Sequence, residues 1–393
     1  MKSPDNIFHR EEEYLLHTYK RIPIKISHGE GVYLFTTDGK KYLDFFSGLA
    51  VNALGYGNKK VIQAIEEQIK KFIHLSNYYF NSPQIELAEI LVKYSGLSKV
   101  FFANSGTEAV EASLKLIRKH FGPDKKIITF SNAFHGRTYG SLSLSGKENY
   151  KKYFAPLLPN IVQLEFNNVE QLEDIIDRNT AAVYLEFIQG EGGIQVASNQ
   201  FVDQIIELRD RIGFALVADE VQSGIGRTGK PFAYNHYEIK PDLVIVAKAI
   251  GGGLPLGALI TNKKFENIFQ PGDHGSTFGG NPVACAAGLA LVNEVFENGM
   301  ITNVVKLGDY FKSKLKIIHK TYSDKITDVR GLGFMLGVEL CKPCASLVDI
   351  FREKGILVNC TSENVLRILP PLISTKENMD YFLNIFNQIL IEQ

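Results

Sequence analysis

The stretch LVIVAKAIGGGLPLGA, residues 243–258, places a lysine at the end of an apolar run and three glycines shortly after it. The run 243–247 is rich in β-branched residues and has the length of a buried strand. Lys248 is therefore predicted at the carboxyl end of a strand. A lysine in that position usually only reaches out to solvent. In a desolvated site, however, a lysine becomes nucleophilic enough to form a Schiff base with an aldehyde.

Short apolar runs alternate with helical patterns on the amino-terminal side of this stretch. The segments 107–120 and 201–212 carry apolar residues at helical spacing and lie between strand candidates. This alternation is typical of an α/β fold with a mostly parallel sheet covered by helices on both faces. Ligands of such sheets bind outside the carboxyl ends of the strands. The strand candidates are 99–103, 126–130, 181–188 and 214–219.

The two ends of the chain have different patterns. Residues 20–46 alternate apolar and polar residues around glycine turns, which predicts an antiparallel meander. After a long helix at about 282–297, strand candidates lie between amphipathic helices. We therefore predict three parts: an N-terminal segment that belongs to a small domain (1–50), a large ligand-binding domain (51–290) and a C-terminal small α+β domain (291–393).

Composition excludes several classes of function. Lys+Arg and Asp+Glu are equal at 43 each, so no net field recruits nucleic acid or an anionic membrane. Charges interrupt the first residues, and no apolar run has the length of a membrane span, so neither a signal peptide nor a span is expected. Four cysteines predict no disulfide framework and favour a reducing cytoplasm. The CKPC of Cys341 and Cys344 is interpreted as an incidental loop, with no metal.

Two strand ends carry residues suited to a phosphate and a flat ring. Ser105 and Glu108 have the spacing of a capping box, and Gly106 lets a ligand approach the free amides of the following helix. A purely structural cap has the same pattern. Phe134 and Arg137 follow the next strand, where they could stack on a ring and hold a carboxylate. An ordinary loop with a buried phenylalanine is the alternative.

Acidic residues end two further strands. Glu191 lies between glycines, where a solvated turn residue is the simpler interpretation. Asp219 ends an apolar run, and burial of a carboxylate requires a cation or a donor. Together, the strand ends suit one ligand with a phosphate, a flat ring, a basic ring nitrogen and an aldehyde for Lys248. Pyridoxal 5′-phosphate has all four, and a lysine Schiff base with an acidic partner for the ring nitrogen is how proteins bind it.

Seven motifs, in order, resemble the class III pyridoxal-phosphate-dependent aminotransferases of fold type I, closest to their acetylornithine aminotransferase branch. The resemblance extends from about residue 29 to 371. It implies a seven-stranded, mostly parallel sheet in the large pyridoxal-phosphate-binding domain and an obligate homodimer with shared active sites. The motifs are NSGTEA, FHGRT, QGEGG, DEVQSGIGRTG, AKAIGGGLPLGA, HGSTFGGNP and RGLGFMLGVEL.

The resemblance assigns roles toward the cofactor. Lys248 is implied to form the Schiff base and then to shuttle the proton, while Asp219 keeps the pyridine nitrogen protonated. Gln222 is implied to bind the phenolic oxygen of the ring, and Phe134 to stack on its face. Thr277 is implied to reach the phosphate of the neighbouring subunit. The phosphate-binding start of the helix comprises Ser105, Gly106 and Thr107.

The resemblance also assigns roles toward the substrate. Arg137 is implied to bind the α-carboxylate of an acylated ornithine, with Ser276 close by. Glu191 and Arg367 match a switch pair whose opening lets the arginine bind 2-oxoglutarate or glutamate. Leu49 stands where ornithine δ-aminotransferases carry a tyrosine, which favours a substrate with a capped α-amine. Two departures from the family pattern, Phe187 and Tyr56, leave the acyl group open between acetyl and succinyl.

The favoured hypothesis is an N-acylornithine 5-aminotransferase that uses glutamate as amine donor in arginine biosynthesis. An ω-aminotransferase for free ornithine, 4-aminobutyrate or a diamine keeps the same fold. A mutase of the glutamate-semialdehyde type has no need of the Glu191 and Arg367 pair. A cofactor-binding protein without catalysis is disfavoured because every residue that transamination requires is present.

Overall fold

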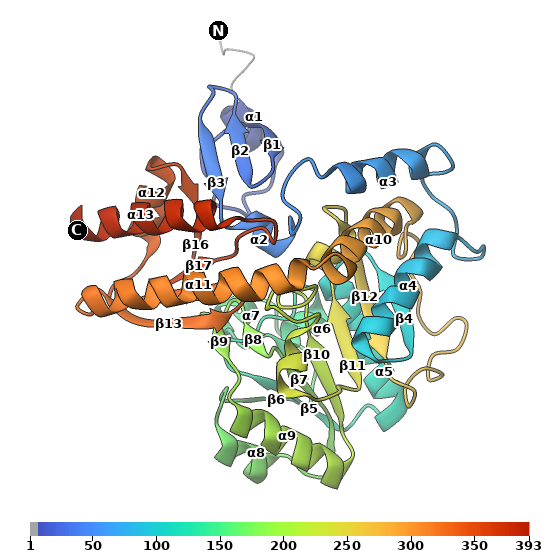
Figure 1. Ribbon diagram of the computed structural model, residues 1–393. Coiled ribbons are helices and arrows are strands. Elements are labelled where there is room, and N and C mark those ends of the chain that lie inside the picture. The colour runs from blue at the N-terminus through green and yellow to red at the C-terminus, as the bar shows by residue number, and fades with distance from the viewer. Residues whose placement is uncertain (1–6, 393) are drawn as a thin grey trace.

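A seven-stranded sheet forms the centre of the computed structural model, which describes residues 7–392 (Figure 1). Residues 1–6 of the predicted N-terminal segment and residue 393 lie outside the described part. The strand order is β4-β12-β11-β10-β7-β5-β6, and only β12 runs antiparallel to its neighbours. The predicted mostly parallel sheet is confirmed. The strands are β4 (Lys99–Ala103), β5 (Lys126–Phe130), β6 (Ile161–Leu164), β7 (Thr180–Leu185), β10 (Ala215–Asp219), β11 (Leu243–Val246) and β12 (Gly257–Thr261).

Both faces of this sheet are buried, which explains why its strands are almost continuously apolar. In β11, Val244 and Val246 pack into one apolar core, while Leu243 and Ile245 pack into another on the opposite face. Helix α5 contributes to the second core, and α4, α9 and α10 contribute to the first. The helices are α3 (Lys59–Ile69), α4 (Ser82–Ser95), α5 (Gly106–Phe121), α6 (Tyr139–Leu144), α7 (Glu148–Lys151), α8 (Val169–Ile175), α9 (Asn199–Ile212) and α10 (Pro282–Glu297).

The N-terminal meander and the C-terminal part share a sheet. Strand β3 pairs with β2 in antiparallel and with the C-terminal strand β15 in parallel orientation. A second four-stranded sheet has the order β13-β14-β17-β16. The strands are β1 (Ile26–Glu30), β2 (Tyr33–Thr36), β3 (Lys41–Asp44), β13 (Ile326–Leu332), β14 (Met335–Leu340), β15 (Ile356–Leu357), β16 (Asn359–Thr361) and β17 (Val365–Ile368). The helices are α1 (Ile7–Tyr14), α2 (Ser47–Ala50), α11 (Met300–Thr321), α12 (Ala345–Glu353) and α13 (Lys376–Glu392).

Short elements join the two parts near the carboxyl ends of the large sheet. A two-stranded ribbon consists of β8 (Ile188–Gln189) and β9 (Gln195–Val196). Single 3-10 turns, η1 (Ala233–Tyr237) and η2 (Lys248–Gly251), follow β10 and β11. The ribbon carries Glu191 at its tip, and η2 begins with the lysine of the opening stretch.

One disulfide departs from the expectation of reduced cysteines. Cys344, at the start of α12, is bonded to Cys360 of β16, with 5.7 Å between the two Cα atoms. Sixteen residues separate the two cysteines, so the fold and not a spacing motif brings them together. Cys341 is free and exposed. Residues 7–392 contain no cluster of three or more potential metal-ligating His, Cys, Asp or Glu side chains, and none of their helices is long and apolar enough to cross a membrane.

Candidate active site

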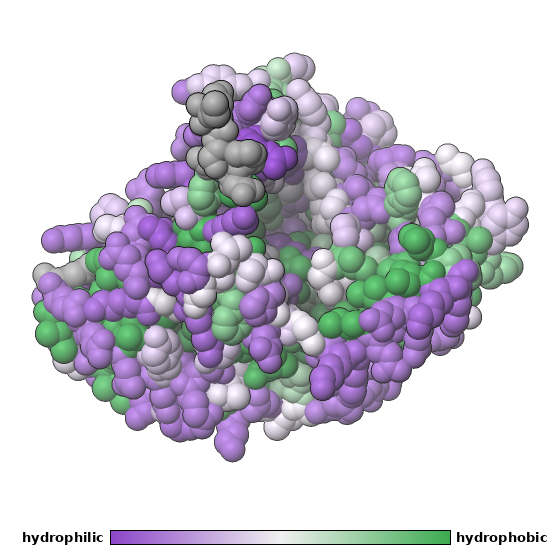
Figure 2. Space-filling model, turned by 90° about the horizontal axis from the view of Figure 1, so that it is seen from above, coloured by the Kyte–Doolittle hydropathy of each residue, from purple (hydrophilic) through white to green (hydrophobic). Residues whose placement is uncertain are grey.

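A cavity of about 490 Å³ lies at the carboxyl ends of β10 and β11 and at the start of α5. Its size is that of a cofactor site. Most of the residues predicted from the sequence line it, although they come from separate motifs: Ser105, Gly106, Thr107, Phe134, Arg137, Glu191, Asp219, Gln222 and Lys248. Viewed from above, the surface of the molecule is hollowed near its middle (Figure 2).

Lys248 has the properties of a nucleophilic amine. Strand β11 ends at Val246, and Lys248 follows with a φ of 52°, a left-handed conformation that is rare for residues other than glycine. Such strain is characteristic of functional sites. Burial, reinforced by the charge of Arg367, lowers the pKa of Lys248 to about 8. At this pKa roughly a tenth of the amine is neutral at pH 7, against less than about 0.1% at the ordinary lysine pKa of 10.5, which favours the predicted Schiff base.

Asp219 and His135 form a buried pair beneath the cavity. The Asp219 Oδ2 atom lies 2.7 Å from His135 Nδ1, and Asp219 Oδ1 accepts a hydrogen bond of 3.1 Å from the amide of Val221. Burial lowers the pKa of His135, but the hydrogen bond and charge of Asp219 and the charge of Glu186 raise it more, and the net shift is upward. The sequence identified Asp219 but gave His135 no role; the FHG turn was its only signal.

Glu186 is a second buried group that sequence reasoning missed. Its carboxylate accepts hydrogen bonds from the amides of Phe134 and Gly190. Burial raises its pKa to about 7, and it faces the His135 and Asp219 pair. Glu186 thus fixes the ring-stacking turn and the Glu191 ribbon to the same acidic centre.

The start of α5 provides donors for a phosphate. Ser105 Oγ accepts a hydrogen bond of 3.3 Å from the amide of Glu108, as a capping residue does. The Glu108 carboxylate binds the amide of Asn104 instead of that of Ser105, so the predicted capping box is only half formed. The first amides of a helix have no intrahelical partner, and those of Gly106 and Thr107 lie on the cavity.

Two further aromatic and polar contacts shape the cavity. The guanidinium carbon of Arg137 lies 3.9 Å from the centre of the Tyr150 ring and 5.4 Å from that of Phe134. The two rings meet edge to face. Tyr150, which the sequence did not single out, therefore positions Arg137 and Phe134 at the same time.

Glu191 and Arg367 form the predicted pair. Arg367 Nη1 lies 2.6 Å from Glu191 Oε1, and its Nη2 donates a hydrogen bond of 2.6 Å to Asn359 Oδ1. Arg367 is only 2% exposed. Burial favours the neutral form of Glu191, but the Arg367 charge outweighs it and holds the pKa of Glu191 below its ordinary value. Gln222 Oε1 lies 3.5 Å from Arg367 Nη1.

Four predicted residues do not line the cavity. Arg367 contacts it only through Glu191 and Gln222, which do line it. Leu49 is 37% exposed, although Val51, two residues later, does line the cavity. Ser276 Oγ accepts a hydrogen bond of 3.0 Å from Asn104, a cavity residue. Thr277 lines a different, open hollow of about 1290 Å³ beside Tyr78 and Phe80.

The two departures from the family pattern do not line the cavity. Phe187 is fully buried and packs against Tyr234 and Tyr237. Tyr56 donates a hydrogen bond of 2.6 Å to the buried carboxylate of Asp44. Both residues therefore act on the surroundings of the site rather than on a ligand within it.

The donor set fits pyridoxal phosphate. Free helix amides suit its phosphate, Phe134 suits its ring, a buried carboxylate suits its ring nitrogen, and Lys248 suits its aldehyde. Gly136 supports this shape, because a Cβ atom there would lie 2.4 Å from Thr107 Oγ1 and would close the phosphate end. Bound pyridoxal phosphate supplies a reactive carbonyl and an electron-withdrawing ring.

Known proteins resemble the chain over its full length. The family model for class-III aminotransferases matches residues 14–390. An acetylornithine aminotransferase of Aquifex aeolicus is 46% identical over 96% of this chain and 100% of that protein. One of Methanocaldococcus jannaschii is 43% identical over 99% of both proteins.

Solved structures agree with this assignment. The ornithine aminotransferase of Toxoplasma gondii superposes with a TM-score of 0.94 at 28% identity and covers 100% of this chain and 96% of its own. The acetylornithine aminotransferase of Elizabethkingia anophelis has a TM-score of 0.87 at 32% identity and covers 98% of both chains. The predicted family, fold type and cofactor are confirmed. The chain therefore belongs to the class-III aminotransferases and is a pyridoxal-phosphate-dependent transaminase.

Proposed function

We propose that this aminotransferase moves the terminal amino group of an N-acylornithine, acetylated or succinylated, to 2-oxoglutarate in arginine biosynthesis. One observation carries the proposal: the cavity is lined by Arg137, which forms no ion pair among residues 7–392, and by Glu191, whose carboxylate masks a second arginine, Arg367. While Glu191 pairs with Arg367, only Arg137 can bind a substrate carboxylate. When Glu191 leaves Arg367, both arginines can bind one. The names of the relatives from Aquifex aeolicus and Methanocaldococcus jannaschii support an acetylated substrate.

In the proposed reaction, Lys248 Nζ would hold the cofactor at rest and would carry the proton that the substrate carbon loses. The carboxylate of Asp219 would face the ring nitrogen, and His135 positions this carboxylate. The Gly106 and Thr107 amides, with Ser105 as helix cap, would hold the phosphate. Phe134 would stack on the ring, and Gln222 would bind the phenolic oxygen.

The substrates are proposed to bind in turn to the same two arginines. Arg137, oriented by Tyr150, binds the α-carboxylate of the acylornithine while Glu191 masks Arg367. A dicarboxylate displaces Glu191 and occupies both arginines. Leu49 adds no hydroxyl or charge at the cavity entrance, which suits a capped α-amine, and Ser276 supports the entrance through Asn104.

Steady-state rates across an amine panel test the proposal. With 2-oxoglutarate as acceptor, kcat/KM should be highest for N-acetylornithine or N-succinylornithine and about 100-fold lower for free ornithine, because its charged α-amine finds no partner. The ornithine aminotransferase of Toxoplasma gondii makes free ornithine the second candidate, with 4-aminobutyrate as a further comparison. A higher kcat/KM for ornithine or 4-aminobutyrate would assign the chain to that reaction.

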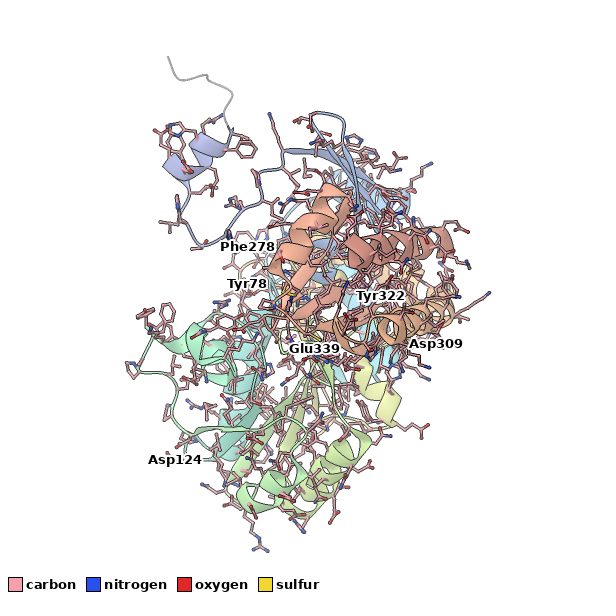
Figure 3. All side chains as sticks on the ribbon, turned by 90° about the vertical axis from the view of Figure 1, so that its left-hand side faces the viewer. Tyr78, Asp124, Phe278, Asp309, Tyr322 and Glu339 are labelled. Atoms are coloured by element: carbon pink, nitrogen blue, oxygen red, sulfur yellow. A yellow bond between two sulfur atoms is a disulfide. The ribbon has the colours of Figure 1, made fainter. Side chains whose placement is uncertain are left out.

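We also propose that the enzyme is a homodimer with shared active sites. The support is an exposed aromatic surface beside Thr277: Tyr78 is 93%, Phe80 94% and Phe278 59% exposed. Figure 3 shows Tyr78 and Phe278 near each other at the edge of the molecule, and Asn77 hydrogen-bonds the backbone of the 276–279 segment. A monomer rarely exposes such a patch. Thr277 would then reach the phosphate of the neighbouring subunit.

Two further proposals concern organisation and location. We propose the division into 1–50, 51–290 and 291–393, with the first and last parts forming one small domain; the pairing of β3 with β15 supports it. We propose the cytoplasm as the location, because a chain with only four cysteines suits a reducing compartment. A free-thiol count in freshly lysed cells tests this location against the Cys344–Cys360 disulfide, since such bonds are rare in reducing compartments.

A further inference from the structure

The backbone of Glu191 is fixed more firmly than its role as a mobile mask would suggest. Its carbonyl oxygen accepts hydrogen bonds from Lys147 Nζ at 2.6 Å, Thr361 Oγ1 at 2.9 Å and Ser362 Oγ at 3.0 Å. Lys147 precedes α7, whereas Thr361 and Ser362 belong to the β16–β17 hairpin. Because donors on two sides hold the main chain, unmasking of Arg367 is a movement of the Glu191 side chain alone.

A carboxylate that leaves Arg367 needs another cation. Three cations stabilise the charged form of Glu191 against its burial: Arg367, Lys248 and Lys147. During reaction with a dicarboxylate, Arg367 is occupied by substrate and Lys248 is engaged in proton transfer. An unpaired carboxylate in a partly buried site costs several kcal/mol. Of the three, only Lys147 remains available as a partner.

Lys147 is close enough and has donors to spare. Its Nζ lies 2.6 Å from the carbonyl oxygen of Glu191, so rotation about the side-chain bonds of the same residue brings the carboxylate to it. An ammonium group has three N–H donors, and among residues 7–392 the Lys147 group uses one, for that carbonyl. The side chain of Lys147 is partly buried, which strengthens a charge pair formed there.

We infer that Lys147 is the counter-ion that receives the Glu191 carboxylate when a dicarboxylate occupies Arg367. Lys147 is in this sense a positioning residue for one half-reaction only. The inference rests on the proposed function in that it takes Arg367 as the dicarboxylate site, but it is independent of which amine is the other substrate. With an acylornithine bound, Glu191 stays on Arg367 and Lys147 only supports the backbone.

Single-turnover absorbance changes of the holoenzyme separate the two half-reactions. In Lys147→Met, we expect the apparent Kd for glutamate to rise by about 10-fold to 100-fold, the value of one lost charge-assisted hydrogen bond, while reaction with N-acetylornithine changes less than about 2-fold. Lys147→Arg keeps the charge and should restore glutamate binding. Lys151→Met is the matched control, because Lys151 ends the short helix α7 that Lys147 precedes and pairs with Glu148 instead.

A second variant separates a charge effect from a structural one. In Glu191→Gln, Lys147 has no carboxylate to receive. Adding Lys147→Met to this variant should therefore leave its Kd for glutamate unchanged within about 2-fold. Equal losses in both half-reactions of Lys147→Met, or a full loss that persists in the Glu191→Gln background, would overturn the inference. If wild-type enzyme reacts with glutamate but with neither N-acetylornithine nor N-succinylornithine, the proposed substrate is wrong, and the glutamate comparison still tests Lys147.

Discussion

The chemistry of the site depends on a few buried ionisable groups. His135 and the Val221 amide contact the carboxylate of Asp219, and Glu186 holds the turn that carries both the stacking ring and the histidine. Burial lowers the pKa of Lys248, which favours the neutral amine. One cavity is thus lined by buried carboxylates and by an amine of lowered pKa, which is a setting suited to proton transfer.

The first prediction at this scale concerns the pH dependence of cofactor binding to the apoenzyme. Only the neutral amine condenses with an aldehyde, so the rate constant for pyridoxal phosphate binding should rise with pH up to about 8, the pKa of Lys248, and level off above it. Stopped-flow absorbance measures this rate, with a free alkylamine as the reference for the cofactor's own titration. A rate that continues to rise toward pH 10.5, the ordinary lysine value, would contradict it.

The second prediction concerns His135. His135→Ala leaves Asp219 Oδ2 without its buried partner, which should lower the free energy of unfolding by about 1–3 kcal/mol. Because the pKa of His135 is raised in the folded protein, the difference from wild type should be largest below pH 6.5 and shrink as the pH rises through the folded pKa. Urea unfolding of the apoenzyme measures it. His135→Asn, which retains a donor, should lose less; an equal loss would mean that the contact with Asp219 is immaterial.

Individual elements show how much the sequence can predict. The strands β4, β5, β7, β10 and β11 were predicted because each is an uninterrupted apolar run between helical patterns. Strand β12 was missed because its residues follow directly on the glycine and proline turn after Lys248, and β6 was missed because a glutamine interrupts a short run. The disulfide and the hydrogen bonds onto Glu191 depend on the hairpin between β16 and β17, whose tertiary position no local pattern encodes.

Some residues of the site could be predicted from the sequence and others could not, because only some of them belong to local patterns. Motif residues at strand ends, such as Asp219 and Lys248, converge because parallel strands end at one edge of the sheet. Glu186 and Tyr150 act through tertiary contacts that no local pattern encodes, and for His135 the FHG turn gave no indication of its contact with Asp219.

A prediction at the element scale concerns the turn before α6. In Gly136→Ala, the new Cβ would lie 2.4 Å from Thr107 Oγ1 at a φ of 137°, so the phosphate end of the cavity must shift and the affinity for pyridoxal phosphate should fall about 10-fold or more. Equilibrium dialysis measures the affinity. Gly39→Ala is the matched control: its φ of 83° brings similar backbone strain, but no atom lies within 4 Å. It should lose about 1 kcal/mol of stability and no affinity. Equal affinities for pyridoxal phosphate in both variants would contradict the assignment of the phosphate to this end of the cavity.

At the scale of the whole molecule, the main feature is the exposed aromatic surface formed by Tyr78, Phe80 and Phe278. Figure 2 shows apolar side chains on the side where α3 and α4 lie, and Phe80 and Phe278 are exposed beside the hollow that contains Thr277. Ser276 links this hollow to Asn104 in the cavity. The site of one chain therefore adjoins the surface through which a second chain is proposed to bind.

The prediction at this scale is that Phe80→Asp combined with Phe278→Asp converts the proposed dimer into a monomer. Burying two carboxylates at an apolar interface costs several kcal/mol, which exceeds what a pair of side chains contributes to association. Sedimentation velocity should show wild type at twice the mass of one chain and the variant at one mass, with transaminase activity lost because the neighbouring Thr277 is absent. An active monomer would contradict shared active sites.

The most direct test of the proposed reaction is the fate of the nitrogen atom. The holoenzyme is given N-acetylornithine labelled with ¹⁵N at the terminal amine, together with 2-oxoglutarate, and the glutamate formed is examined by mass spectrometry. If the terminal amino group passes through the Lys248 site to the dicarboxylate, essentially every glutamate carries the label, and label at the α-nitrogen gives none. Unlabelled glutamate from the terminally labelled substrate, or no glutamate from either N-acetylornithine or N-succinylornithine labelled in this way, would contradict the proposed function.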